Sequence, residues 1–401
     1  MNRTDIIRGG GQVLLLSMRR LSELVAYTMM YEFEDLIGAL TMADRVDVGD
    51  EAKLEFARRT FKLIRRASGS RTLAHRYAPL PSAVRLDRDY ELFFPTFNNP
   101  HELYALAAVP DWRQHCRVAV CYVNEVWAHI LPDYLLELLD GFDHIFLGMR
   151  HCVETVARIT GRPCSYLPLA ADVLRFSGGP DYPSRSIGVC NIGRRSEVTH
   201  EALMVLAARR EIFYYYDTFA GGAGSFSKQR TFRVEKPAEH RQLLANLLRR
   251  SRFYIANRSR VNEPEYTAGH DEISGRFYEG AAAGTVMLGE PPRTPEFQDQ
   301  FAWPDAVIRM PFDHPTIGRT LRELDGDPER LARIQCDNMR NAALRHDWSH
   351  RLRTVFTEAG MPSTPAMLQR ERQLQELAVQ ISPATAASAA GQSPAKRSLR
   401  P

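Results

Sequence analysis

The feature that most constrains the fold is a regular alternation of short apolar runs with longer amphipathic stretches. The run 13–17 is typical of a buried strand, and the stretch 21–40 repeats apolar residues at helical spacing. Strands that alternate with helices form parallel sheets, so this pattern predicts an α/β fold. In this first series we expect strands at 13–17, 90–95, 118–123 and 144–147, and helices that include 21–40 and 52–67. A further short strand is expected at 165–169, where the pattern begins to repeat.

The pattern starts again after a stretch rich in Gly, Pro and Ser at 177–186, which is typical of a connecting loop. We therefore expect two Rossmann-like domains, residues 1–165 and 166–360, that face a central cleft at the carboxyl ends of their strands. Residues 361–401 are expected to form an exposed helix at 365–381 and a disordered basic tail. The second series comprises expected strands at 187–192, 212–216, 253–257 and 285–289, and expected helices at 201–209, 238–250 and 274–284.

The charge distribution argues against a general nucleic-acid surface. The chain has 52 Lys and Arg against 48 Asp and Glu, or +4. Five basic and two acidic residues from position 361 onward account for +3, so the remainder is near +1. No apolar run reaches the ~18 residues of a membrane span, and the run 13–16 is too short for a secretion signal. The six cysteines form no C-x-x-C pair, so we expect buried, reduced thiols in a cytoplasmic protein.

The segment 271–290 carries the clearest chemical signal. Asp271 and Ser274 are residue types that cap helices, Gly275 follows them, and residues 280–284 read Gly-Ala-Ala-Ala-Gly. A helix that begins at the carboxyl end of a strand presents N–H groups to an anion such as a diphosphate. The Glu279 carboxylate can accept two hydrogen bonds from ribose hydroxyls. The alternative is a surface acid on a helix whose small residues serve packing.

This segment resembles the donor-binding signature of GT-B glycosyltransferases. In that signature two acids are separated by seven residues, and the second opens an E-A-x-A-x-G-x-P run. Asp271 and Glu279 have this separation, and the small residues follow Glu279, although Val286 stands in place of the proline. The resemblance, to retaining group-1-like enzymes, implies that Glu279 binds the donor ribose and that Asp271 is a catalytic residue near the donor sugar.

Three further segments resemble the same family and occur in the expected order. Residues 166–176 resemble an LP-x-x-x-D-x-x-x-F segment, and residues 188–195 resemble a strand that ends in Gly-Arg. Residues 343–351 resemble an H-x-W/Y-x-x-R stretch. The region 275–356 is especially similar to the C-terminal domain of spore-coat-maturation-type glycosyltransferases. The resemblance thus covers about 166–356 and implies two Rossmann-like domains in the GT-B arrangement.

Other candidates for donor binding lie at the ends of predicted strands. Gly193 ends one strand, and Arg194 after it can hold a pyrophosphate with paired donors. The family has a Lys a few residues later that this chain lacks, so Arg195 is the expected second cation. Arg260, in the loop after 253–257, is a further candidate for the same role, and Ser274 and Gly275 begin the donor-binding helix. The alternative for the arginines is a solvated pair.

Candidates for acceptor chemistry lie in the first half. Glu125 and His129 follow the strand 118–123, where they can bind acceptor hydroxyls or transfer a proton. A structural Glu and a surface His are the alternative. The D-x-D pairs at 87–89 and 325–327 fall in charged turns, and no H-E-x-x-H occurs, so we expect no metal site.

These observations predict a metal-independent glycosyltransferase. It would take a nucleotide-diphosphate sugar as co-substrate and use no cofactor. Its acceptor would be a glycan, a lipid-linked glycan or a small molecule, in glycan or polysaccharide biosynthesis. We expect no nucleic-acid partner and at most peripheral membrane contact. The alternatives are a non-catalytic nucleotide-binding protein, a sugar-nucleotide epimerase, and a protein that binds nucleic acid through the basic tail.

Overall fold

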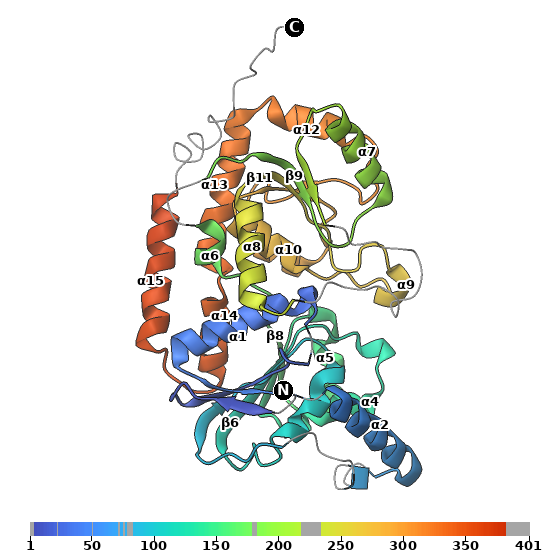
Figure 1. The fold of residues 1–401 in the computed structure, drawn as a ribbon, viewed down its shortest axis with the longest axis vertical. Helices are drawn as coiled ribbons and strands as arrows, with labels where there is room; N and C mark the ends of the chain where they lie inside the picture. Colours follow the sequence, from blue (N-terminus) through green and yellow to red (C-terminus); the bar gives the residue numbers. More distant parts are fainter. Residues whose placement is uncertain are drawn as a thin grey trace. The chain divides into compact units, whose positions relative to one another are not determined.

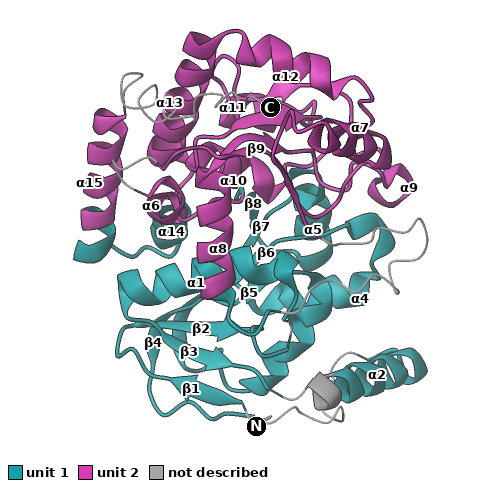
Figure 2. Cartoon of the chain, turned by 45° about the horizontal axis from the view of Figure 1, so that its top comes forward, with its two compact units in different colours: residues 1–168, 233–237, 351–368 teal, residues 169–232, 238–350, 369–401 magenta. Residues whose placement is uncertain are grey.

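The chain divides into two compact units, each built on its own sheet (Figures 1 and 2). Unit 1 comprises residues 1–168, 233–237 and 351–368, and unit 2 comprises residues 169–232, 238–350 and 369–401. Both sheets are mainly parallel, which confirms the predicted α/β class with two Rossmann-like sheets. The predicted tail at 382–401 lies outside the described residues. The computed structural model describes residues 4–21, 23–49, 51–70, 73–74, 77, 83–178, 183–217 and 234–381.

The sheet of unit 1 has the strand order β1-β3-β2-β4-β6-β7-β8, with β5 beside β6. All pairs are parallel except β1 with β3. The central strands are apolar, and Leu14, Leu92 and Val120 are fully buried. The strands are β1 (Asp5–Ile7), β2 (Val13–Ser17), β3 (Asp44–Asp47), β4 (Tyr90–Phe93), β5 (Thr96–Phe97), β6 (Cys116–Val123), β7 (His144–Leu147) and β8 (Cys164–Tyr166).

Strand β3 was not predicted, because three of its four residues are charged. The Asp44 carboxylate is fully buried and accepts hydrogen bonds from the backbone N–H groups of Gly9 and Gly10 at 2.8 and 2.9 Å. Tyr90 donates its hydroxyl to the same carboxylate at 2.8 Å, and Arg8 pairs with it at 2.9 Å. Long-range partners therefore place a charged segment in the sheet, which a search for apolar runs cannot detect.

The helices of unit 1 connect these strands and cover the sheet. Helix α1 buries Phe33 and Ile37, and elsewhere the Trp112 ring lies against Phe93 and Phe142 with both centroid distances at 5.0 Å. These contacts give unit 1 a core of its own. The helices are η1 (Val25–Tyr27), α1 (Thr28–Thr41), α2 (Glu51–Ser68), η2 (Pro100–Ala108), η3 (Ala128–Ile130), α4 (Asp133–Leu136), η4 (Glu137–Gly141), η5 (Arg150–Cys152) and α5 (Val153–Thr160).

The sheet of unit 2 has the order β10-β9-β11-β12-β13, and every pair is parallel. Side chains of alternate residues enter two separate cores, because neighbouring residues of a strand face opposite sides of the sheet. Cys190 and Tyr254 belong to one core, and Val189 and Phe253 belong to the other. The strands are β9 (Ile187–Asn191), β10 (Tyr214–Tyr216), β11 (Ser251–Ile255), β12 (Val286–Gly289) and β13 (Ile308–Arg309).

Helices cover both faces of this sheet. Residues of α6, α8, α10, α13 and α15 enter the first core, and residues of α7 and α12 enter the second. The sheet is thus buried on both sides, as parallel sheets are. The helices are α6 (Val173–Ser177), α7 (Glu197–Ala208), α8 (Pro237–Arg249), α9 (Pro264–Thr267), α10 (Gly275–Ala282), α11 (Pro295–Gln300), α12 (Ile317–Asp325), α13 (Pro328–Arg345) and α15 (Pro365–Gln380). Most of α14 (Trp348–Glu358) and the first turn of α15 belong to unit 1.

The predicted helix at 365–381 exists as α15, but the expectation that it is exposed is wrong. Leu374 and Leu377 pack in the first core of unit 2. Arg370 donates to Asp172 at 2.6 Å and to Asp347 at 2.7 Å, and Asp347 is fully buried. Burial by itself raises the pKa of Asp347, but the Arg370 charge together with hydrogen bonds from Arg370 and Ser349 holds that pKa below its ordinary value. Segments 166–176 and 343–351, both part of the family resemblance, therefore each contribute a carboxylate to Arg370.

Two general expectations can be compared with the structure. None of the helices in the described ranges is long and apolar enough to cross a membrane. All six cysteines are free thiols; Cys116 and Cys164 are partly exposed, whereas the other four are buried.

Candidate functional site

The strand order of unit 2 marks one place where a ligand can reach the sheet. Strands β9 and β11 are neighbours, yet the chain leaves β9 for β10 on one side and leaves β11 for β12 on the other. The loops that follow, 192–196 and 256–274, therefore diverge at the carboxyl ends of the two strands. Ligands of open parallel sheets bind at such switch points.

Gly193 brings the first turn of α10 to the end of β9. Its φ is +73°, a left-handed conformation that favours glycine, and its N–H donates to Asp217 at 2.8 Å. A Cβ at this position would collide with Nη2 of Arg276, so the Arg276 guanidinium lies against the Gly193 backbone. Arg276 is the second residue of α10, so its charge and the positive end of the helix dipole coincide.

The three arginines predicted to bind the donor are already paired with carboxylates. Glu263 contacts Arg194 through one oxygen and Arg260 through the other, both at 2.7 Å. Arg195 pairs with Asp217 and also donates to the Asp217 carbonyl at 2.7 Å. Each guanidinium would have to share or exchange a partner to hold a diphosphate. Their predicted roles stay predictions.

Arg276 differs from these arginines, and no role was expected for it from the sequence. It makes no ion pair or hydrogen bond with any residue of the described ranges. The available signal was its place, two residues after Ser274 and three before Glu279, in the first turn of the expected anion-binding helix. An unneutralised guanidinium at this place can hold a phosphate group with paired donors.

Glu279 lies on α10 and is 6% exposed. One of its oxygens, Oε1, pairs with Arg241 of α8, which is itself 2% exposed and lies over the Phe176 ring at 4.8 Å. The other oxygen, Oε2, accepts no hydrogen bond from the part of the chain that the structure describes. Glu279 is therefore a buried, oriented carboxylate with one oxygen available, and not a surface acid.

The small residues after Glu279 serve packing inside unit 2. A Cβ at Gly280 would collide with Met287 and touch the Tyr254 ring, and Gly284 has a φ of +63° and abuts Met339. The three alanines between them are buried. The glycines therefore allow α10 to approach β11, β12 and α13, which was one of the two interpretations of this run.

Two buried polar atoms near the switch point have no hydrogen-bond partner among the described residues. They are the Tyr254 hydroxyl on β11 and Oδ1 of Asn191 at the end of β9, and both residues are at most 1% exposed. Burial raises the pKa of Tyr254, and the charges of Glu279 and Arg276 act on the same hydroxyl. Unsatisfied polar atoms at this depth are uncommon, and a ligand or ordered water commonly satisfies them.

Ser274 directly precedes α10, as predicted, but its side chain does not cap the helix. Its hydroxyl donates to the Asn257 carbonyl at 2.6 Å, so no side chain occupies the N–H groups that begin at Gly275. Asp271 does not cap α10 either, because its carboxylate binds Arg258 at 3.2 Å and the Arg293 N–H at 3.1 Å. The catalytic role predicted for Asp271 stays a prediction.

The acceptor candidates lie in unit 1 at the end of β6. Glu125 accepts a hydrogen bond from the Trp127 indole at 2.8 Å. The Trp127 residue that donates this bond is 2% exposed. His129 is exposed, and its ring contacts the edge of the same indole. Both side chains thus contact Trp127, and these contacts do not test the acceptor role that was predicted for them.

The acidic D-x-D pairs are used in local contacts. Asp87 pairs with Arg8 at 2.6 Å and Asp89 with His115 at 2.8 Å. Asp325 pairs with Arg252, and Asp327 caps the start of α13. Within the described ranges, no group of three or more His, Cys, Asp or Glu side chains is placed to hold a metal ion.

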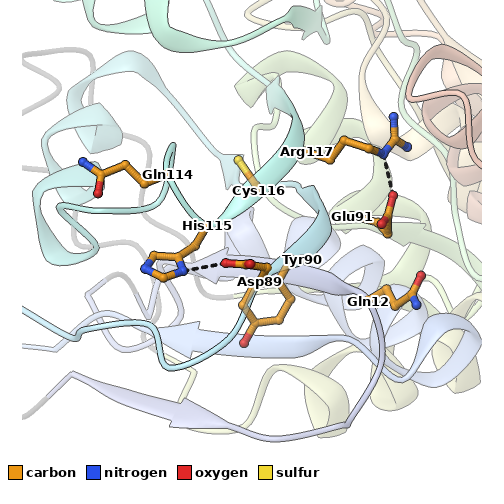
Figure 3. Close-up of a pocket in the computed structure, with 8 residues that line it drawn as sticks. All are labelled: Gln12, Asp89, Tyr90, Glu91, Gln114, His115, Cys116 and Arg117. Atoms are coloured by element: carbon orange, nitrogen blue, oxygen red, sulfur yellow. Dashed lines mark hydrogen bonds and ion pairs between the residues drawn. The ribbon is translucent and has the colours of Figure 1, made fainter.

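A hollow of about 360 Å³ lies in unit 1, at the edge of the sheet opposite to the carboxyl ends of its strands. Figure 3 shows that its charged side chains point at one another: Arg117 donates to Glu91 at 2.5 Å, and His115 contacts Asp89. The hollow is formed where β4 and β6 begin. Within unit 1 it therefore lies at the other end of β6 from Glu125, which follows that strand.

Comparison with known proteins finds a family model that matches less than half of the chain. Residues 189–357 match a family model described as "Glycosyl transferase-like". This range runs from β9 into α14 and contains Gly193, Arg276 and Glu279. No curated protein matches the chain. The resemblance drawn from the sequence is confirmed over this range.

Solved structures are similar to the chain at low sequence identity. TarM is 7% identical with a TM-score of 0.43, over 67% of this chain and 54% of that one, so the chain spans about half of TarM. The glycotransferase of kitacinnamycin is 12% identical with a TM-score of 0.36, over 93% and 99% of the two chains. The Gap123 glycosylation-associated protein complex from Streptococcus agalactiae is 11% identical with a TM-score of 0.35, over 78% and 58%.

Proposed function

We propose that this chain, whose residues 189–357 form a glycosyl transferase-like domain, transfers a sugar from a nucleotide-diphosphate donor to an acceptor. One observation carries the proposal. The Arg276 guanidinium, in the first turn of α10, lies against Gly193 at the end of β9 and pairs with none of the described residues. The diphosphate of such a donor is the group that needs both a cation and N–H donors.

The position of Glu279 supports a nucleoside on the same side of α10. Arg241 holds Oε1 and leaves Oε2 to accept a hydrogen bond. A ribose offers two neighbouring hydroxyls as donors, and a charged acceptor makes these bonds stronger than a neutral one. Glu279 and Arg276 are three residues apart and so lie on one side of the helix, about one turn from each other. This spacing suits a ribose joined directly to a diphosphate.

In the proposed reaction, the bond between the anomeric carbon and the diphosphate oxygen breaks and leaves its electron pair on the diphosphate. The acceptor hydroxyl oxygen forms the new bond to the same carbon, and its proton passes to the departing diphosphate oxygen. The Arg276 guanidinium and the first N–H groups of α10 stabilise the growing negative charge without reorganisation. No step of this scheme needs a metal ion or a further cofactor.

We place the acceptor at unit 1, with Glu125 and His129 as the candidates to contact it. A glycan, a lipid-linked glycan or a small molecule would serve as acceptor, because each offers a hydroxyl. A cytoplasmic location is part of the proposal and is supported by the six free thiols, since disulfides are rare in reducing compartments.

The proposal is tested by thermal unfolding of the full chain with UDP, GDP, ADP, CDP and TDP. A nucleotide at 100 times its Kd is expected to stabilise the wild type by about 2.7 kcal/mol. Arg276→Gln should weaken that nucleotide about 10–150-fold, because a charge-assisted hydrogen bond contributes about 1.5–3 kcal/mol. Arg194→Gln should have a smaller effect, since Arg194 is already paired with Glu263. Arg319→Gln, at an arginine whose side chain is 80% exposed, is the matched control.

Other outcomes separate the alternatives. If no nucleotide stabilises the wild type at millimolar concentration, or if Arg276→Gln binds as tightly as the wild type, the donor site is misplaced. Nucleotide binding without transfer to any acceptor would identify a non-catalytic binding protein. Conversion of a sugar nucleotide into an isomer without an acceptor would identify an epimerase.

A further inference from the structure

Helix α2 of unit 1 has one face packed on the protein and another in solvent. Ala57 and Phe61 are buried, and the Phe61 ring meets the Tyr104 ring of η2 edge-on at 5.4 Å. Figure 2 shows α2 on the outside of unit 1. The helix is therefore anchored through one face, and its opposite face needs a separate explanation.

The solvent face of α2 combines large apolar side chains with cations. Phe56 is 61% exposed and Leu63 is 69% exposed, and their spacing of seven residues places them on one line along the helix. Arg59 and Arg66, also seven residues apart, are exposed beside this line, as is Lys62 between them. We call Phe56, Arg59, Lys62, Leu63 and Arg66 the α2 stripe.

The α2 stripe carries three cations and lies in a strongly basic segment, in which Arg59 also pairs with Glu55 at 3.0 Å. The residues from 55 to 68 include five basic and one acidic, for a net charge of +4, and the whole chain also has +4. The rest of the chain is therefore neutral on balance. The charged residues of this segment are Glu55, Arg58, Arg59, Lys62, Arg65 and Arg66.

We propose that the α2 stripe binds the surface of an anionic lipid bilayer. A helix with Phe and Leu on one line and Lys and Arg beside it lies in the interface, with the apolar side chains among the acyl chains and the cations at the headgroups. Nucleic acid would use the cations but would leave Phe56 and Leu63 in water. A second copy of this chain, placed symmetrically on the stripe, would set Arg59, Lys62 and Arg66 against their own copies, which repel. This surface lies on unit 1 and does not depend on the proposed donor site.

The test is flotation of the full chain with lipid vesicles. We expect binding to vesicles of phosphatidylcholine with phosphatidylglycerol, much weaker binding to phosphatidylcholine alone, and loss of binding as salt rises and screens the charges. The variant Arg59→Gln/Lys62→Gln/Arg66→Gln should bind about 100-fold more weakly, at about fivefold for each cation near the surface. Phe56→Asp/Leu63→Asp should bind at least about tenfold more weakly.

Matched controls use unit 2. Arg319→Gln/Arg322→Gln/Arg333→Gln removes the same charge from side chains that are 80%, 68% and 52% exposed, and it should retain binding. Val205→Asp/Leu243→Asp changes two exposed apolar residues and should also retain it. Thermal unfolding of every variant confirms that it folds.

Three results would overturn the proposal. The first is no binding of the wild type to anionic vesicles at low salt. The second is an equal loss of binding in the stripe variants and in the unit 2 controls. The third is a wild-type dimer in light scattering that Phe56→Asp/Leu63→Asp converts into a monomer, because a second copy would then cover the stripe.

Discussion

The two units share a strand order but differ in what they place at the carboxyl edge of the sheet. Unit 1 contains β3-β2-β4-β6-β7 and unit 2 contains β10-β9-β11-β12-β13. In both orders the first strand of the series lies between the second and the third, so each unit has the same switch point. Topology alone would make the two edges equally suited to a ligand.

In unit 1 a network of polar side chains closes part of this edge, although Oδ1 of Asn98, directly after β5, is buried without a hydrogen-bond partner among the described residues. Glu34 of α1 is 1% exposed and accepts hydrogen bonds from Ser17 at 2.5 Å and Thr96 at 2.6 Å. Arg19 completes the network with an ion pair to Glu34 at 2.9 Å and another to Asp35 at 2.8 Å. These donors and acceptors contribute to stability and leave little capacity for a ligand.

In unit 2 the corresponding edge keeps unsatisfied groups. Arg276 pairs with none of the described residues, and the Tyr254 hydroxyl and Asn191 Oδ1 are buried without hydrogen-bond partners there. The same topology thus gives both units such an edge, and we propose that Arg276, a cation without a partner among the described residues, makes the edge of unit 2 the one that binds a ligand. Three predictions test this contrast between a closed edge and an open one.

The largest expected effect concerns the closed network of unit 1. Glu34→Ala would leave buried donors of Ser17, Thr96 and Arg19 without their acceptor and should reduce the free energy of unfolding by about 3–5 kcal/mol. Arg276→Ala, at the open edge, should change it by no more than about 0.5 kcal/mol, because no described partner is lost. Urea unfolding of both variants measures the contrast. Equal destabilisation would show that the two edges do not differ in this way.

A second prediction uses pH to probe the same edge of unit 1. Burial, with a contribution from the Glu34 charge, raises the pKa of Glu102 from 4.5 to about 7, although Asn98 donates to this carboxyl. Between these values the folded protein holds a proton that the unfolded chain releases. This contribution to stability is complete below about pH 4.5 and is lost as pH rises through 7, by about 3 kcal/mol at 1.36 kcal/mol per pKa unit.

Urea unfolding between pH 5 and 8 measures this loss, and Glu102→Gln should remove most of it. A wild-type stability that rises over this range, or one whose slope is the same in Glu102→Gln, would contradict the assignment. Because Glu102 lies in unit 1, its substitution should leave nucleotide binding unchanged.

The smallest expected effect sharpens the comparison at the open edge. Gly193→Ala should cost about 1–2 kcal/mol of stability, because φ is positive there. It should also weaken nucleotide binding, because the new Cβ displaces the Arg276 guanidinium. Gly161→Ala is the control, since Gly161 has a φ of +67° but open space around its Cα. Nucleotide titration should separate the two variants, and equal affinities would argue against the contact between Gly193 and Arg276.

The sequence was sufficient for elements that form from local pattern. Strands β2 and β7 have the predicted bounds, 13–17 and 144–147, because apolar runs bounded by polar residues define buried strands. The sequence was not sufficient for elements whose position depends on partners far away in the chain. Strand β3 depends on groups that neutralise Asp44, and the burial of α15 depends on Asp172 and Asp347, about 200 and 20 residues from Arg370.

The candidate site divides in the same way. The sequence by itself determined that Glu279 follows a polar loop and a strand on a short helix, because spacing and residue type are local properties. The fold adds that Arg194 and Arg260 share the Glu263 carboxylate, that Arg195 pairs with Asp217, and that Arg276 pairs with none of the described residues. Arg260 and Glu263 are only three residues apart, but Arg194 is far from Glu263 in the sequence, as Arg195 is from Asp217. An ion pair needs two charges within about 4 Å, and distant side chains reach that separation only after the chain has folded.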